Sequence, residues 1–399
     1  MPVVDRLVVL LPGFEHMPIE AHYRRFVREA EKTAPVYDMQ LTEAAPLKVS
    51  LPDAAAPTGE FSLRSTGRDW SARTDFVLYG LGDITMFYAS RHPVVRLLSG
   101  IIALLDFTVT GTFFRFVVTS WRYSLFFLYP LVLVGIVVAA SFGVGSLAAT
   151  FGLGGPIAPL ALALVSAAIL LLFAIRKMHL LLIMDDWTFA RDTARGKRPD
   201  VMRKLDNVIA DAVARIGEAP AKTEIVVAAH SLGAICALQL LDAALLRNSS
   251  RRYGLLTVGS SLLKVALHPA ARRLRKSVER VANSNTTWID VQSLTDPINF
   301  YKSDPVRNLK IAGGKSPVLV RVRFRSQLCD DAYKAIRRNF FRVHRQFVFG
   351  VEKRTPYSWH VILCGPEPFA DIAARGGLAC DHPVSASSAT LKVSGPAIT

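Results

Sequence analysis

Cysteine is scarce in this sequence, and its four cysteines are far apart. Cys236, Cys329, Cys364 and Cys380 form no CxxC pair in a chain of 399 residues. A disulfide framework and a cysteine-based zinc site are therefore not indicated. We expect reduced cysteines, as in a cytosolic setting.

Charge is absent from one long stretch of the chain. From Tyr123 to Ile175 there are 53 residues without a single Asp, Glu, Lys, Arg or His, interrupted near the middle by a glycine-rich segment. Two helices of about 20 residues, rising about 1.5 Å per residue, would each cross a hydrocarbon core of roughly 30 Å. The stretch predicts a transmembrane hairpin with helices near Ser124 to Ala148 and near Ile157 to Leu181.

The preceding apolar stretch is a weaker candidate for a membrane span. Leu97 to Val118 contains Asp106 and Arg115, and charged residues are costly inside a hydrocarbon core. An interfacial or re-entrant helix is the expected structure. If the segments on both sides of the membrane region belong to one fold, the number of crossings must be even, which two spans satisfy and three do not.

Flanking charges predict the orientation of the hairpin. Arg115 and Arg122 precede it, Arg176 and Lys177 follow it, and the connection between its helices carries no charge. By the positive-inside rule, both ends of the hairpin face the cytoplasm. We expect an integral membrane protein with both termini in the cytoplasm, and the richness in Ala and Arg favours a bacterial inner membrane.

The net charge is as unevenly placed as the apolar residues. The chain combines a formal charge of +16 with a positive mean hydropathy of +0.30. Residues 1 to 122 hold 13 basic and 13 acidic residues, whereas residues 176 to 399 hold 35 and 19. This basic excess is expected to favour the lipids of an anionic leaflet. No nucleic-acid recognition motif accompanies it, so nucleic acid is not an expected partner.

Outside the membrane region, apolar runs typical of strands alternate with helical patterns. Strands are expected at Arg6 to Leu11, Glu224 to Ala228, Gly254 to Val258, Thr287 to Val291 and Tyr357 to Cys364, with a strand among loops in Ala34 to Ser62 and a strand or helix at Phe76 to Met86. Helices are expected at Glu20 to Lys32, Pro199 to Ile216, Gly233 to Leu246 and about Ala270 to Val281. This alternation predicts an α/β fold whose mainly parallel sheet is doubly wound, with helices on both faces.

The expected organisation is one domain with an insertion. Residues 1–95 form the first part of the domain, and residues 185–380 form the remainder. Residues 96–184 form the membrane region between them. Residues 381–399, rich in Ser and Ala, are expected to be a disordered tail.

One motif in this pattern carries chemistry. The residues AHSLG, from Ala229 to Gly233, lie between a predicted strand and a predicted helix. They match the nucleophile elbow G-x-S-x-G except for Ala at the first position. The elbow needs small residues because a strand turns sharply into a helix and holds the nucleophile in a strained backbone conformation.

On these residues the sequence resembles the α/β-hydrolase superfamily, in particular its lipase- and esterase-like members. The resemblance implies that Ser231 is the nucleophile and that His230 packs within the elbow. The loop from Pro12 to Phe14, after the first strand, is similar to the oxyanion loop of the family. The backbone N–H groups of Phe14 and Leu232 would then stabilise the developing oxyanion.

Members of the superfamily order their triad as nucleophile, acid and base. For the acid, Asp296 in the loop beyond a predicted strand is preferred to Asp290 within that strand. For the base, His344 is preferred to His360, which lies in an apparent strand, and to His382 in the tail.

The resemblance implies acyl transfer through a Ser-His-Asp triad and an acyl-enzyme, a mechanism that needs neither a metal nor an organic cofactor. Because the hairpin is inserted within the fold, the site would lie near the bilayer, where hydrophobic or amphiphilic esters partition. The expected function is that of a membrane-anchored serine hydrolase of the esterase or lipase type. The alternative is a hydrolase-like membrane scaffold or partner-binding protein without activity.

Overall fold

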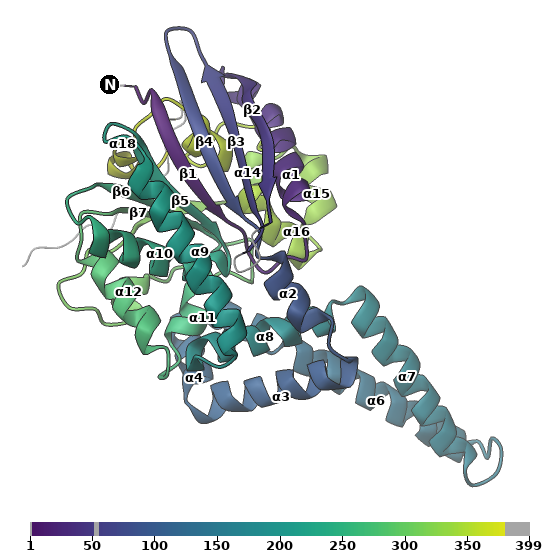
Figure 1. The fold of residues 1–399 in the computed structure, drawn as a ribbon. Coiled ribbons are helices and arrows are strands. Elements are labelled where there is room, and N and C mark those ends of the chain that lie inside the picture. The colour runs from purple at the N-terminus through teal and green to yellow at the C-terminus, as the bar shows by residue number, and fades with distance from the viewer. Residues whose placement is uncertain (1, 52–55, 380–399) are drawn as a thin grey trace, which may run out of the picture.

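One sheet of eight strands forms the centre of the computed structural model, which describes residues 2–51 and 56–379 (Figure 1). Along the chain the strands are β1 Asp5–Leu11, β2 Gln40–Ser50, β3 Thr58–Thr66, β4 Ser71–Tyr79, β5 Glu224–His230, β6 Tyr253–Val258, β7 Thr287–Ser293 and β8 Val318–Val322. Their spatial order is β2-β3-β4-β1-β5-β6-β7-β8. Strand β3 is antiparallel to both of its neighbours, and the other neighbouring pairs are parallel. The predicted α/β class with a mainly parallel sheet is confirmed.

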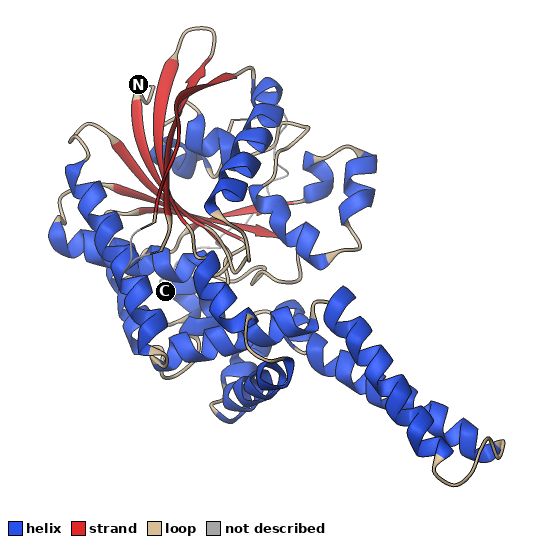
Figure 2. Ribbon diagram, turned by 45° about the vertical axis from the view of Figure 1, so that its right-hand side comes forward, coloured by secondary structure: helices blue, strands red, loops and turns tan. Residues whose placement is uncertain are grey.

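Helices lie on both faces of the sheet (Figure 2). One face packs against α8 Leu180–Arg195, α9 Pro199–Glu218, α10 Gly233–Arg247 and α12 Arg272–Ala282. The other packs against α1 Ile19–Thr33, α16 Phe340–Arg345, α17 Trp359–Cys364 and α18 Phe369–Arg375. Short segments complete the fold: η1 Ala34–Tyr37, α11 Leu262–Ala266, α13 Pro305–Asn308, α14 Phe324–Gln327, α15 Asp330–Ile336 and η2 Gln346–Val348.

The side chains of β1 explain why both faces are covered. Leu7, Val9 and Leu11 belong to the core under α9 and α10, whereas Val8 and Leu10 belong to the core under α1 and α17. Successive side chains of a strand point to opposite faces, so a continuous apolar run buries both. The five apolar residues LVVLL therefore required helices on each side of the sheet.

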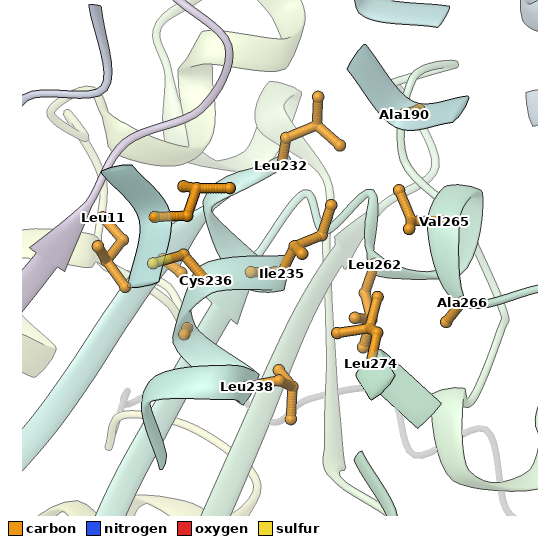
Figure 3. Packing of buried hydrophobic residues seen from close by; sticks show 14 of the residues in the cluster. Leu11, Ala190, Leu232, Ile235, Cys236, Leu238, Leu262, Val265, Ala266 and Leu274 are labelled. Carbon is orange, nitrogen blue, oxygen red and sulfur yellow. The ribbon is translucent and has the colours of Figure 1, made fainter. Parts of the chain in front are cut away.

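Helix α10 is packed tightly where it follows β5 (Figure 3). Its side chains Ile235 and Cys236, together with Leu232 just before it, lie among Leu11 from the end of β1 and Leu262 from α11. Each fully buried Leu or Ile stabilises the fold by roughly 1.5–3 kcal/mol. The turn between β5 and α10 is thus held by a dense apolar core.

Three sequence-based assignments differ from the structure. Tyr357 to Cys364 was expected as a strand but contains α17. Ser358 caps the start of this helix, because its side chain accepts a hydrogen bond from the Val361 N–H. A short apolar run fits a buried helix as well as a strand, so periodicity could not separate them. The region 34–62 holds η1, all of β2 and the first part of β3, and 76–86 spans the end of β4 and part of α2 Gly82–Ala89. The predicted tail lies outside the described residues.

In the described part of the chain, two helices are long and apolar enough to cross a membrane, α6 Tyr129–Thr150 and α7 Ala158–Lys177. In the most apolar part of each helix, only 17% and 6% of the residues are buried. The two helices pack against one another and project away from the sheet (Figures 1 and 2). The first begins later than predicted, because Trp121–Phe127 forms a separate helix, α5.

The stretch expected to lie at the membrane interface forms two helices, α3 Pro93–Val109 and α4 Thr112–Thr119, separated at Gly111. On one side α3 packs against α8, where Arg96 forms a 2.6 Å ion pair with the buried Asp185. The other side exposes seven large apolar side chains: Val94, Val95, Leu98, Ile101, Ile102, Leu105 and Val109. Helices α2 and α3 together are long and apolar enough for a span, but they are bent by 104°.

Candidate active site

Ser231 occupies a strained turn between β5 and α10. Its φ angle of 54° is left-handed, which is uncommon for a residue other than glycine. Main-chain bonds fix this turn on the neighbouring strand: the Ser231 N–H donates to the Val258 carbonyl at 3.0 Å, and the Ser231 carbonyl accepts from the Ser261 N–H at 3.2 Å. Strain of this kind persists where the surroundings impose it, and it is often functional. The hydroxyl is thereby held at the carboxyl end of the sheet.

Two glycines allow the backbone to approach this turn closely. A Cβ atom added to Gly13 would lie 2.9 Å from the Ser231 Cβ, and one added to Gly233 would lie 2.3 Å from the Leu11 carbonyl oxygen. Both contacts arise because β1 lies parallel to β5, with Leu11 beside Ala229. The loop after β1 is therefore adjacent to Ser231, as an oxyanion loop would have to be.

The predicted acid and base are in direct contact. The carboxylate of Asp296 and the Nδ1 atom of His344 are 2.7 Å apart, and both side chains are buried. The carboxylate also accepts hydrogen bonds from the N–H groups of Ile298, at 2.9 Å, and Asn299, at 3.1 Å. These bonds fix the carboxylate, which in turn fixes the imidazole ring.

Asp296 engages one ring nitrogen of His344, and the other nitrogen is Nε2. Its Nε2 atom is buried and has no hydrogen-bond partner among the described residues. It is not hydrogen-bonded to Ser231, whose Oγ lies 3.4 Å from the Oγ of Ser261. Both Ser231 and His344 line the same cavity. Catalytic hydrogen bonds are often long in unliganded enzymes and shorten when substrate binds.

The alternative candidates lie elsewhere. Asp290 is buried in β7, where its carboxylate accepts hydrogen bonds from Thr257, at 2.5 Å, and Gln292, at 2.7 Å; burial raises its pKa to about 6. His360 is buried in α17 against the Phe26 ring, and burial lowers its pKa to about 3. Neither residue lines the cavity that contains Ser231. His382 lies outside the described residues.

His230 packs beside His344, a contact that the motif did not predict. Its ring lies 4.7 Å from the His344 ring, and its Nε2 atom lies 3.2 Å from the His344 carbonyl oxygen. Burial and the proximity of His344 lower the pKa of His230 to about 3. A neutral His230 can donate to that carbonyl and so support the segment that carries His344.

The cavity has a volume of about 250 Å³ and is mainly apolar. Its apolar wall consists of Phe14, Met17, Tyr123, Phe126, Phe127, Leu182, Ile183, Trp187, Ile298 and Phe341. Several of these side chains come from α5, directly before α6, and from α8, directly after α7. The segments that lead into and out of the two apolar helices therefore form one side of the cavity.

An ion pair also borders the cavity. The ammonium of Lys264, on α11, contacts the carboxylate of Asp186, on α8, and Lys264 is buried. Burial lowers the pKa of Lys264, while the nearby Asp186 opposes that effect. The ion pair therefore joins α8, which follows α7, to α11, which begins directly after Ser261. Neither it nor Ser261 belongs to a recognisable motif, so sequence reasoning missed both.

The site shows no sign of a metal centre. Within residues 2–51 and 56–379, no group of three or more His, Cys, Asp or Glu side chains is placed to hold an ion. The cavity lining includes the Ser231 hydroxyl and the His344 imidazole, together with the side chains of Ser261, Lys264 and Asp186.

Comparison of the chain with protein-family models, with curated proteins and with solved structures gave no match. The functional interpretation therefore depends on the geometry of this site and on the elbow motif.

Proposed function

We propose that this protein is a membrane-anchored serine hydrolase that cleaves an acyl ester. One observation carries the proposal: Ser231, in a left-handed turn between a strand and a helix, lines the same cavity as a buried His344 that is hydrogen-bonded to Asp296. A strained serine at a strand-to-helix turn is the setting of a nucleophile elbow. A buried acid that fixes a histidine tautomer is the companion that such a serine needs.

The chemistry proposed for these groups is a two-step acyl transfer. Ser231 Oγ attacks the ester carbonyl while His344 Nε2 takes its proton, and the imidazolium then protonates the leaving alcohol. The N–H groups of Phe14 and Leu232 stabilise the oxyanion of each tetrahedral intermediate. Water, activated by His344, hydrolyses the acyl-enzyme and restores Ser231. Asp296 remains ionised and keeps the Nδ1 proton in place.

The membrane position is part of the same proposal. Helices α6 and α7 cross the bilayer as a hairpin, and the exposed apolar side of α3 lies in the interface beside them. Both connections to the rest of the fold then lie on one side, the cytoplasmic one by the positive-inside rule. Esters dissolved in the bilayer would reach a cavity whose wall is built from α5 and α8.

One observation favours the alternative of an inactive membrane scaffold with a hydrolase-like site. Ser231 and His344 are not hydrogen-bonded, and Ser231 Oγ instead lies 3.4 Å from the Ser261 hydroxyl. Activity separates the two functions.

Ser231→Ala is expected to lower the hydrolysis of a p-nitrophenyl acyl ester by about 10⁴-fold or more, because removal of a triad nucleophile leaves only residual catalysis. The assay uses purified protein in mild detergent, with wild type and Ser250→Ala as references. Ser250 is exposed and lies before β6, at the end of the sheet opposite the cavity. Equal rates for wild type and Ser231→Ala would favour the scaffold.

Excision of residues 129–177 is expected to convert an integral protein into a peripheral one. The ends to be joined lie close together, since the Tyr129 hydroxyl donates to the Met178 carbonyl at 3.4 Å. A short Gly-Ser linker can therefore connect residues 128 and 178. Wild type should stay in the membrane pellet after alkaline carbonate, whereas the excised protein should bind membranes at neutral pH and be released by carbonate. Release of the wild type by carbonate would contradict the two spans.

A further inference from the structure

Arg345 is a charged residue in the cavity wall that lacks a charged partner of its own. The two acidic residues that line the cavity are already engaged, since Glu15 pairs with Arg25 and Asp186 with Lys264. Asp296, which lies behind His344, is bonded to that residue. The Nε atom of Arg345 donates to the Phe341 carbonyl at 3.2 Å. No carboxylate of the described residues forms an ion pair with its guanidinium, although the side chain is half-buried beside the catalytic candidates.

The helix that carries Arg345 lies against the ends of the two apolar helices. Phe340 of α16 packs against Phe126 and against Tyr129, at the start of α6. The Phe341 ring lies 4.5 Å from the His179 ring, just after the end of α7. If α6 and α7 span the bilayer, Arg345 lies at the depth of the lipid head groups.

Other basic residues beside this end of the two apolar helices also lack an acidic partner. Arg176 and Lys177 end α7, and Arg342 is exposed on α16; none of the three forms an ion pair with an acidic group within the described part of the chain. Unpaired guanidinium and ammonium groups beside a membrane favour phosphate. Arg345 differs from the other three because it lines the cavity.

We propose that Arg345 forms an anion subsite for the phosphate of the substrate, which would make the ligand an acyl ester of a phosphate-bearing amphiphile. A guanidinium binds phosphate through paired N–H donors, while the apolar wall holds the acyl chain. The proposal deepens the proposed hydrolase function and rests on it for the fate of the ester, but the binding site itself does not require catalysis.

Two sources could supply this chemistry, a phospholipid of the leaflet or a soluble long-chain acyl thioester of a nucleotide carrier. The cavity wall formed by α5 and α8 favours the lipid, because these helices adjoin α6 and α7. A test of binding separates the subsite from catalysis, since Ser231→Ala can be used throughout with ether-linked lipids that cannot be cleaved.

The probes are an alkyl ether glycerol phosphate and the same alkyl glycerol without phosphate, in neutral detergent. The phosphate is expected to strengthen binding to Ser231→Ala, and Arg345→Gln in that background should reduce this preference by roughly 10- to 100-fold, the value of hydrogen bonds to a charged group. Arg345→Lys should recover part of it. The matched control is Arg252→Gln, an exposed arginine before β6 at the opposite end of the sheet.

Competition by a long-chain acyl-CoA identifies the source of the phosphate-bearing ligand. If the thioester binds more tightly than the lipid phosphate, the subsite serves a soluble ligand. If the thioester binds more weakly, the subsite serves a lipid. An equal phosphate preference with and without Arg345→Gln would overturn the proposal. This result can be obtained whether or not the wild type hydrolyses esters, so failure of the subsite and failure of the hydrolase remain distinguishable.

Discussion

Asp296→Asn is expected to lower kcat by about 10⁴-fold, the loss that follows when a triad histidine is left in the wrong tautomer. The carboxylate accepts from His344 Nδ1 at 2.7 Å, and an amide at this position can instead donate to Nδ1 and leave the proton on Nε2. His344 could not then accept the proton of Ser231. The loss corresponds to about 5.4 kcal/mol of transition-state stabilisation.

The measurement is steady-state hydrolysis of an acyl ester together with the thermal unfolding midpoint of each variant. Asp290→Asn provides a matched control, because Asp290 is a buried carboxylate on the same strand-loop segment but is bonded to Thr257 and Gln292. We expect a much smaller change in kcat for this variant. A large loss for Asp290→Asn with near-normal activity for Asp296→Asn would exchange the roles of the two acids.

Arg6→Met is expected to reduce the free energy of unfolding by about 3–5 kcal/mol, the cost of breaking a buried ion pair. The Arg6 side chain is completely buried in β1 and forms a 2.6 Å ion pair with Glu224 of β5. It also donates to the carbonyls of four residues near the end of the described chain: Ile362, Leu363, Gly365 and Glu367. Methionine fills much of the volume but leaves these acceptors and Glu224 without their donor.

Denaturant unfolding in detergent, followed by tryptophan fluorescence, gives this value. Arg73→Met is the comparison, since Arg73 lies on the adjacent strand β4 and pairs with Asp75 at the surface, where both side chains are about half exposed. Such exposed pairs contribute roughly 0–1 kcal/mol. A similar small change for both variants would show that Arg6 does not hold the C-terminal segment onto the sheet.

Local patterns were enough to predict the central strands and the turn at Ser231. A short apolar strand, a small-residue turn and an amphipathic or apolar helix follow one another between Glu224 and Arg247, and each leaves its signal within a few residues. The two apolar helices were equally clear, because an uncharged apolar stretch of this length is rare inside soluble domains. Only their boundaries shifted.

Contacts between distant segments could not be predicted in this way. The hydrogen bond between Asp296 and His344 joins residues 48 positions apart. The expected order of nucleophile, acid and base along the chain limited the candidates for these two roles, but it did not show that the two side chains touch. The roles of Ser261, Lys264 and Arg345 depend on which helices surround the cavity. Strand β8 was not predicted, because it is only five residues long and carries a charge. The structure buries Val320 and Val322 on either side of the exposed Arg321.

Labelling with a fluorophosphonate, with the adduct located by peptide mass spectrometry, shows whether Ser231 is an activated nucleophile. We expect one adduct, on Ser231, in wild type and in Ser261→Ala, and none in Ser231→Ala. Labelling of His344→Gln should be much slower. If a folded wild-type preparation carries no adduct, or carries it on Ser261 in place of Ser231, then Ser231 is not the nucleophile.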